Sequence, residues 1–275
     1  MNAFETAIKF FAELSIETPT LYGWFHMCWL AITALSCTLV FCMRKRITQK
    51  QMDVTLIVWG TALVFIEILK QLVVSFRFVN GRVEWSYAWW AFPFQFCSMP
   101  LYLAIPAGAL RQGKIKDALN SFLSSYALLG GAIAMIYPAN MFTTSAFISI
   151  HTMLWHSSMV TVCFMLLASK TVKPSVKALL RAGIVFIIVT AIAIALNVII
   201  GECTGVRDVN LFFISPYEAW KVPIIKLVYD AVPYPVYLLL FIIAMTAAAA
   251  LILAAAHGFN KLAERVRERN EGKTA

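Results

Sequence analysis

The chain has 275 residues, 61% of them hydrophobic and only 13% charged, whereas soluble domains are about 45–50% apolar and about 25% charged. This composition argues against a soluble domain and indicates an integral membrane protein. The net charge of +9 does not indicate nucleic-acid binding, because the basic residues lie at the ends of apolar segments, where they orient a membrane protein.

Residues 1–20 lack the pattern of a signal peptide, because charged residues interrupt every apolar run. Glu5, Lys9, Glu13 and Glu17 recur at every fourth position, and apolar residues occupy the opposite face. This spacing predicts an amphipathic helix that lies in the membrane interface. A frayed polar tail is the alternative interpretation.

Seven apolar segments follow, and each is near the roughly 20 residues that a helix needs to cross the hydrocarbon core. Only helices fit these segments, because an open sheet in lipid would leave backbone groups unpaired. The sequence therefore predicts an all-α polytopic membrane protein in which residues 21–256 form one domain of seven transmembrane helices. The predicted helices cover 21–43, 54–76, 88–110, 119–137, 145–168, 178–200 and 232–256.

Most of the 23 basic residues lie after the first, third and fifth segments and in the tail at 257–275. Because short basic loops stay in the cytoplasm, we expect the N-terminus outside and the basic C-terminal tail in the cytoplasm. The long connection at 201–231 is rich in aromatic residues and contains prolines, which predicts a segment that dips into the outer interface.

The six cysteines do not follow a metal or disulfide pattern. Five of them fall inside apolar segments, and no two have CxxC spacing. Neither a zinc site nor a disulfide framework is indicated, and we expect no metal and no cofactor.

Ionisable side chains at membrane depth are costly, so each one indicates a functional site by default. Glu67 and Lys70 lie three residues apart in the second segment, with Gln71 on the same face. They form either a mutually neutralising pair that faces the bundle, or a site whose carboxylate binds substrate or relays protons.

The third segment combines polar side chains with two prolines. Gln95, Ser98 and Tyr102 share one helical face, and Pro93 and Pro100 each remove a backbone donor. The pattern predicts either a broken helix that lines a cavity or a kink required by packing.

The fifth segment carries His151 and His156, which diverge by about 140° around a helix and are poorly placed to share a metal. A histidine hydrogen-bonded between helices is the alternative to a functional one. From a rise of about 1.5 Å per residue, Glu67, Cys97 and His156 lie at similar depths, and Asn197 lies nearer the outer rim. We expect a polar pocket in the outer half of the bilayer.

Short motifs give the chain a resemblance to a known family. They are Glu67, Pro93 with Cys97, His156-Ser157, Asn197, the stretch 210–216 and Val232-Pro233-Tyr234-Pro235. Over residues 20–255 the chain resembles the YwaF-like bacterial membrane proteins, which are seven-helix proteins of largely undefined function. The resemblance implies a location in the bacterial cell membrane.

Two departures limit what the resemblance implies. Gln95 stands where the family usually has a histidine, and Ser157 replaces a glycine, so a mechanism that needs the first histidine is not carried over. The family is similar to an animal membrane acyltransferase of ether lipids that uses a cysteine–histidine pair. The cysteine of that enzyme aligns near Phe94 rather than Cys97, so the resemblance does not assign the nucleophile.

The sequence leaves three functions open. In an enzyme of lipid acyl transfer or hydrolysis, Cys97 is the nucleophile and His156 the general base, with Glu67 or Gln95 in support. In a scaffold, the buried polar groups only hold helices together. In a transporter or binding protein for a small solute or lipid, the site is lined by Glu67, Lys70, Gln95, Ser98, Tyr102, His151, Asn197 and Asn210. We expect membrane lipids as partners, a lipid or small molecule as substrate and no nucleic acid, and the sequence predicts no particular oligomeric state.

Overall fold

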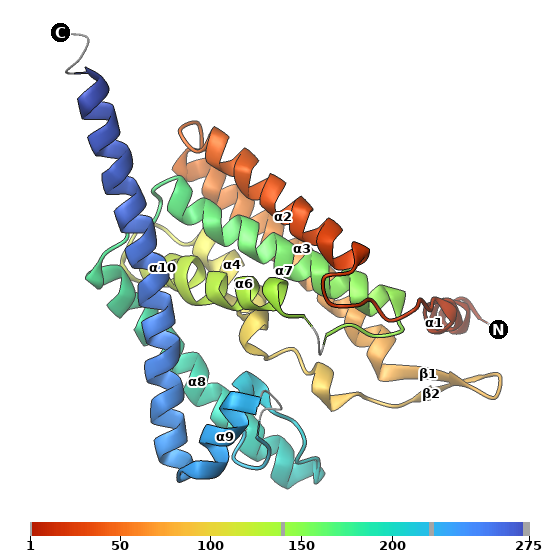
Figure 1. The fold of residues 1–275 in the computed structure, drawn as a ribbon. Coiled ribbons are helices and arrows are strands. Elements are labelled where there is room, and N and C mark those ends of the chain that lie inside the picture. The colour runs from red at the N-terminus through yellow and green to blue at the C-terminus, as the bar shows by residue number, and fades with distance from the viewer. Residues whose placement is uncertain (1, 139–140, 220–222, 272–275) are drawn as a thin grey trace.

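The computed structural model describes residues 2–138, 141–219 and 223–271. In these ranges the protein is mostly helical, and six helices are long and apolar enough to cross a membrane (Figure 1). They are α2 (Trp24–Met43), α3 (Gln49–Ser75), the continuous stretch Lys114–Ile136, α7 (Ala146–Ala168), α8 (Val176–Thr204) and α10 (Tyr234–Glu271). The third of these consists of α5 (Lys114–Phe122), a π-helical turn η3 (Leu123–Ala127) and α6 (Leu128–Ile136).

The third predicted span is not a continuous helix, so six of the seven predicted spans are present as long apolar helices and the count of seven stays a prediction. Two short 3₁₀ turns, η1 (Trp89–Ala91) and η2 (Phe96–Ser98), precede the helix α4 (Met99–Ala109). The 11 residues of α4 reach about 16 Å, which is about half of the hydrocarbon core. Pro93 contributes no backbone N–H to a helix, whereas Pro100 lies in the first turn of α4, where proline is tolerated.

A β-hairpin follows α3, which corrects the expectation of an all-α fold. Strands β1 (Phe76–Val79) and β2 (Arg82–Trp85) pair antiparallel. The turn between them is Asn80-Gly81, and both residues have positive φ, as a type I′ hairpin turn requires. The last residue of the predicted second span, Phe76, therefore belongs to a strand.

The predicted N-terminal helix is present as α1 (Ala3–Glu13). It packs on the hairpin through an edge-to-face contact of Phe4 with Phe76, whose ring centroids are 5.1 Å apart. Its Ile8 side chain is buried. The location of this helix in the membrane interface stays a prediction.

The long connection after α8 folds back against the bundle. Its 3₁₀ turn η4 (Leu211–Phe213) is held by Asn197, which donates to the Leu211 carbonyl oxygen (3.0 Å) and accepts from the Leu211 N–H (2.8 Å). Leu211 and Phe212 are fully buried. A short helix, α9 (Pro223–Ala231), then leads to α10, and the depth of this connection in a membrane stays a prediction.

The basic segments gather at one end of the bundle. Figure 1 shows the C-terminal part of α10 and the connection between α2 and α3 at this end, and α1 with the hairpin at the other. Phe41 of α2 packs edge-to-face on Phe259 of α10, with ring centroids 5.5 Å apart, and Arg181 of α8 forms an ion pair of 2.7 Å with Asp117 of α5. We call these ends the basic end and the hairpin end; which of them faces the cytoplasm stays a prediction from charge.

Lys116 connects three elements at the basic end. This residue is only 2% exposed, and its ammonium group pairs with Asp53 Oδ1 at 2.8 Å. It also donates to the carbonyl oxygens of Gly108 (3.3 Å) and Leu110 (3.0 Å). These carbonyls end α4 and have no partner within the helix, so Lys116 joins α4 to the N-terminal part of α3.

We expect Lys116→Met to lower the free energy of unfolding by about 3 kcal/mol, because Asp53 and two carbonyl oxygens lose their cation. Thermal unfolding in detergent measures this loss. Lys114→Met removes an exposed charge from the same turn and is expected to change stability by less than about 0.5 kcal/mol. Equal unfolding temperatures for the two variants would contradict the role of Lys116.

Candidate functional site

Two cavities adjoin toward the hairpin end of the bundle. The first, which we call the polar chamber, has a volume of about 390 Å³ and lies between α3, the residues before α4, and α7. The second, the apolar chamber, has a volume of about 720 Å³ and lies between α6, α9 and α10. Five residues belong to the walls of both: Cys97, Tyr137, Met141, His156 and Phe213.

The polar chamber brings together most of the residues that the sequence singled out. Its wall includes Glu67, Lys70, Gln95, Cys97, Ser98, His151 and His156. They come from α3, from the broken third segment and from α7, which are distant in the sequence. The expected polar pocket is therefore present as a cavity, and its half of the bilayer stays a prediction.

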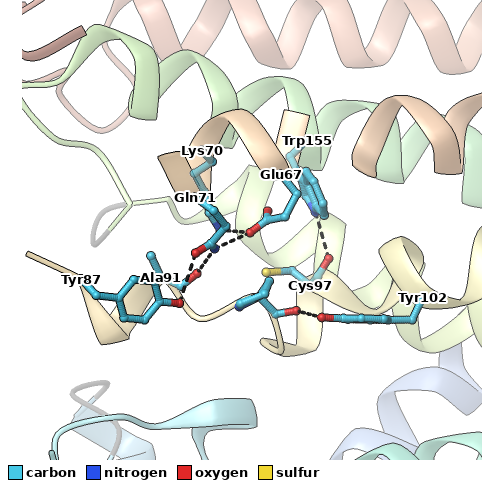
Figure 2. Close-up of polar contacts among 9 residues, drawn as sticks. Glu67, Lys70, Gln71, Tyr87, Ala91, Cys97, Tyr102 and Trp155 are labelled. Atoms are coloured by element: carbon cyan, nitrogen blue, oxygen red, sulfur yellow. Dashed lines mark hydrogen bonds and ion pairs between the residues drawn. The ribbon is translucent and has the colours of Figure 1, made fainter. Parts of the chain in front are cut away.

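Glu67 is buried and bonded on several sides. Its Oε1 atom pairs with Lys70 Nζ at 2.8 Å and accepts a hydrogen bond of 2.7 Å from Gln71 Nε2. The Gln71 amide in turn accepts from the Tyr87 hydroxyl at 3.1 Å. Figure 2 shows this network running from α3 to the residues before α4. The pair is mutually neutralising and faces the bundle, as the first of the two sequence interpretations requires.

The same network holds the irregular backbone before α4. Gln71 Nε2 donates to the Ala91 carbonyl oxygen at 2.7 Å, and Trp155 Nε1 of α7 donates to the Cys97 carbonyl oxygen at 2.9 Å. Non-helical backbone at membrane depth needs partners of this kind because no water is present to supply them. The two bonds fix the position of Cys97 relative to α3 and α7.

Tyr102 stabilises the irregular backbone before α4 and does not line the polar chamber. Its hydroxyl donates to the Pro93 carbonyl oxygen (Figure 2), and its ring packs against Phe94 at a centroid distance of 5.5 Å. Tyr102 lies outside the chamber wall, and its expected role in binding substrate is not supported by this position.

Asn197 and Asn210 also lie away from the chamber. Asn197 is buried, and its carboxamide forms both of its hydrogen bonds with the backbone of Leu211, as described above. The Asn210 side chain accepts from the Ser215 N–H at 2.8 Å and donates to the Glu218 carbonyl oxygen at 2.6 Å. Both asparagines shape the connection between α8 and α10.

Cys97 lies in the 3₁₀ turn η2, directly before the first turn of α4. It is half-buried, and Figure 2 shows its side chain extending toward the side of Glu67 and Gln71, away from Tyr102. The N-terminus of a helix carries a partial positive charge, which favours the thiolate form of a nearby cysteine.

His156 belongs to the wall of both chambers, and one of its ring nitrogens is unpaired in the described structure. It is buried, and its Nδ1 atom lies 2.7 Å from the Thr152 carbonyl oxygen. Because a carbonyl only accepts, Nδ1 carries the hydrogen and Nε2 of the neutral ring carries a lone pair. Nε2 has no partner among the described residues. A buried imidazole in this state can act as a general base.

Two more polar atoms of the chamber lack a partner in the described part of the chain. They are His151 Nε2 and Gln95 Oε1. The His151 ring stacks on Trp155, with centroids 5.5 Å apart and planes inclined by 25°. An unpaired buried polar atom costs about 1–3 kcal/mol, so these atoms favour water or the polar part of a ligand in the chamber.

Sequence reasoning placed Gln71 on the face of Glu67 but did not predict its bond to the Ala91 carbonyl oxygen. It also did not predict the bond from Trp155, which shares a helical face with His151, to the Cys97 carbonyl oxygen. Phe213 had no signal, because its position depends on how the long connection folds back. Over the described ranges, no group of three His, Cys, Asp or Glu side chains is placed to hold a metal ion.

Comparison with known proteins gives a family for the chain. No curated protein and no solved structure matches it. The model of the TMEM164 family matches residues 21–253, which extend from α2 into α10. The more specific resemblance to YwaF-like bacterial proteins stays a prediction. The chain belongs to the TMEM164 family, a family of membrane proteins.

Proposed function

We propose that this protein catalyses acyl transfer to, or acyl hydrolysis of, a membrane lipid in the bacterial cell membrane, with Cys97 as nucleophile and His156 as general base. The observation that carries the proposal is the position of these two residues. Both belong to the wall that the polar and apolar chambers share. A carbonyl group at this boundary has its apolar chain on one side and its polar group on the other.

The apolar chamber suits a lipid chain. Its wall is formed almost entirely by hydrophobic side chains, among them Ile133 of α6 and Leu240 and Ile243 of α10. These three side chains are also exposed on the outer surface of the bundle. A chain can therefore move sideways from the bilayer into the chamber between α6 and α10 without crossing water.

The reaction requires one proton carrier and one nucleophile. His156 Nε2 takes the proton of the Cys97 thiol, and the thiolate attacks the ester carbonyl carbon, so that a carbon–sulfur bond forms. The carbon–oxygen bond of the ester then breaks, and the leaving alkoxide takes the proton from His156. In the second step a lipid hydroxyl or water gives its proton to His156 and attacks the thioester carbonyl carbon, so that a carbon–oxygen bond forms. The carbon–sulfur bond then breaks, and the leaving thiolate takes the proton from His156.

The surroundings of Cys97 support the charges of this reaction. Cys97 lies in the turn that directly precedes α4, and the partial positive charge at the start of a helix can stabilise a thiolate or an oxyanion. The Gln95 carboxamide lies in the same chamber wall and can donate to the oxyanion. Glu67 does not oppose the thiolate strongly, because Lys70 neutralises its charge at 2.8 Å.

A solute-binding protein or transporter is the second candidate, and the charged pair in the chamber wall favours it. For this function Glu67 is the decisive residue and Cys97 is dispensable. The same set of variants therefore separates the two candidates.

We expect Cys97→Ala to abolish turnover of a phospholipid with a labelled acyl chain by the protein in nanodiscs, because Cys97 is the one thiol among the described residues that line both chambers. His156→Asn keeps a donor for the Thr152 carbonyl oxygen but removes the base, and it is expected to slow turnover by roughly 10²–10⁴-fold. Thin-layer chromatography of the labelled products measures both effects.

Cys163→Ala is the matched control, because Cys163 is a buried cysteine outside both chambers. It is expected to leave turnover unchanged. Turnover that survives in Cys97→Ala would overturn the proposal. Loss of solute binding in Glu67→Gln alone, with Cys97→Ala unaffected, would favour the transporter.

A second prediction concerns the mouth of the apolar chamber. Ala244 of α10 lines this chamber and is exposed, so Ala244→Trp is expected to narrow the mouth and lower turnover of long-chain lipids at least tenfold. Turnover of a short-chain ester is expected to stay within twofold. Ala247→Trp, one turn away and outside the chamber wall, is the control. An equal loss for both chain lengths would contradict a lateral mouth.

A further inference from the structure

A third cavity lies at the basic end and shares no residue with the polar or the apolar chamber. It has a volume of about 230 Å³ and lies between the start of α5 and the start of α8. We call it the basic pocket. Its floor includes Asn120, Ser121 and Ala178, which are buried, and its mouth includes the exposed residues Lys173 and Lys177.

The charge of the basic pocket favours an anion. Lys173, Lys177 and Arg181 line it, together with one carboxylate, that of Asp117. Asp117 is already paired with Arg181 Nη1 at 2.7 Å. A guanidinium has five N–H donors, so Arg181 keeps donors for a ligand, and the two lysines add charge that no carboxylate of the wall balances.

The start of α8 adds backbone donors to the same pocket. Ser175 caps this 29-residue helix by accepting from the Ala178 N–H at 3.2 Å. The other N–H groups of the first turn have no acceptor within the helix. Together with the positive end of the helix dipole, such groups form an anion site.

An independent feature of the floor indicates a missing ligand. Asn120 is only 4% exposed, and its Oδ1 atom has no partner among the residues that the structure describes. The carboxamide can accept from a headgroup hydroxyl or ammonium group or, after a half-turn, donate to a phosphate oxygen. The protein leaves this polar group unpaired in a pocket that is otherwise cationic.

The surface beside the basic pocket is apolar. Val176, Leu180 and Ile184 follow one another at every fourth position of α8, and all three are exposed. Ile115 of α5 is exposed in the same way. Acyl chains can therefore lie along α8 while the headgroup occupies the pocket, an arrangement found where basic pockets between transmembrane helices bind anionic headgroups.

From these features we propose that the basic pocket binds the phosphate group of an anionic membrane lipid. Lys173, Lys177 and the first turn of α8 hold the phosphate, and Asn120 binds a polar group of the headgroup. The proposal is independent of the chemistry at Cys97, because the two sites share no residue.

Native mass spectrometry of the full chain in detergent tests the proposal with phosphatidic acid, diacylglycerol and glycerol phosphate. We expect saturable binding of phosphatidic acid and at least tenfold weaker binding of diacylglycerol. Lys173→Gln combined with Lys177→Gln is expected to weaken phosphatidic acid binding at least tenfold, because each cation near an anionic headgroup contributes to affinity.

Lys45→Gln combined with Lys50→Gln is the matched control, because it removes the same charge from exposed positions at the same end outside the pocket. It is expected to change binding less than twofold. Equal weakening by both pairs would overturn the site. Binding of glycerol phosphate as tight as that of phosphatidic acid would keep the phosphate site and overturn its assignment to a lipid.

Asn120→Leu separates binding from folding. Removal of an unpaired buried amide is expected to preserve or raise the unfolding temperature of the lipid-free protein, and to reduce the stabilisation by phosphatidic acid. A variant that unfolds earlier without lipid but retains the full stabilisation by lipid would contradict the role of Asn120.

Discussion

Backbone that leaves the helical conformation inside a membrane must find hydrogen-bond partners within the protein, because the hydrocarbon offers none. The residues before α4 meet this requirement through side chains of their neighbours. Gln71 binds the Ala91 carbonyl oxygen and Trp155 binds that of Cys97. The buried pair of Glu67 and Lys70 belongs to the same arrangement, since Glu67 positions Gln71. The position of the site thus depends on a few bonds from α3 and α7.

The break in the third segment has a consequence for the candidate site. A continuous helix at 88–110 would place the Cys97 carbonyl in its own hydrogen-bond ladder and would have no terminus near the sulfur. In the broken form, α4 begins at Met99, and its positive end directly follows the turn that contains Cys97. The loss of helical bonds is offset by side-chain donors, and it creates the cavity wall that both chambers share.

Hydropathy identified six spans, because a run of about 20 apolar residues in lipid forms a membrane-spanning helix. It could not separate helix from irregular backbone in the third run, where composition stays apolar and only Pro93 and Pro100 signal a change. Asn80-Gly81 was a hairpin signal that a hydropathy window does not register. Lys116 was counted among the basic residues that predict the cytoplasmic side. A count of charges does not reveal that this side chain is only 2% exposed.

The polar side chains of the candidate site fall into two groups, those that already have hydrogen-bond partners within the protein and those that do not. The sequence does not show to which group a side chain belongs. Asn197 and Asn210 were singled out for their polarity, but each bonds the protein's own backbone, and such groups stabilise the fold. His156 Nε2, His151 Nε2 and Gln95 Oε1 are equally buried and unpaired in the described structure. A fold keeps such atoms at a cost of about 1–3 kcal/mol each, and three of them around one chamber are more readily explained by a ligand than by packing. The unpaired atoms, rather than the charged pair, therefore indicate where a ligand would bind.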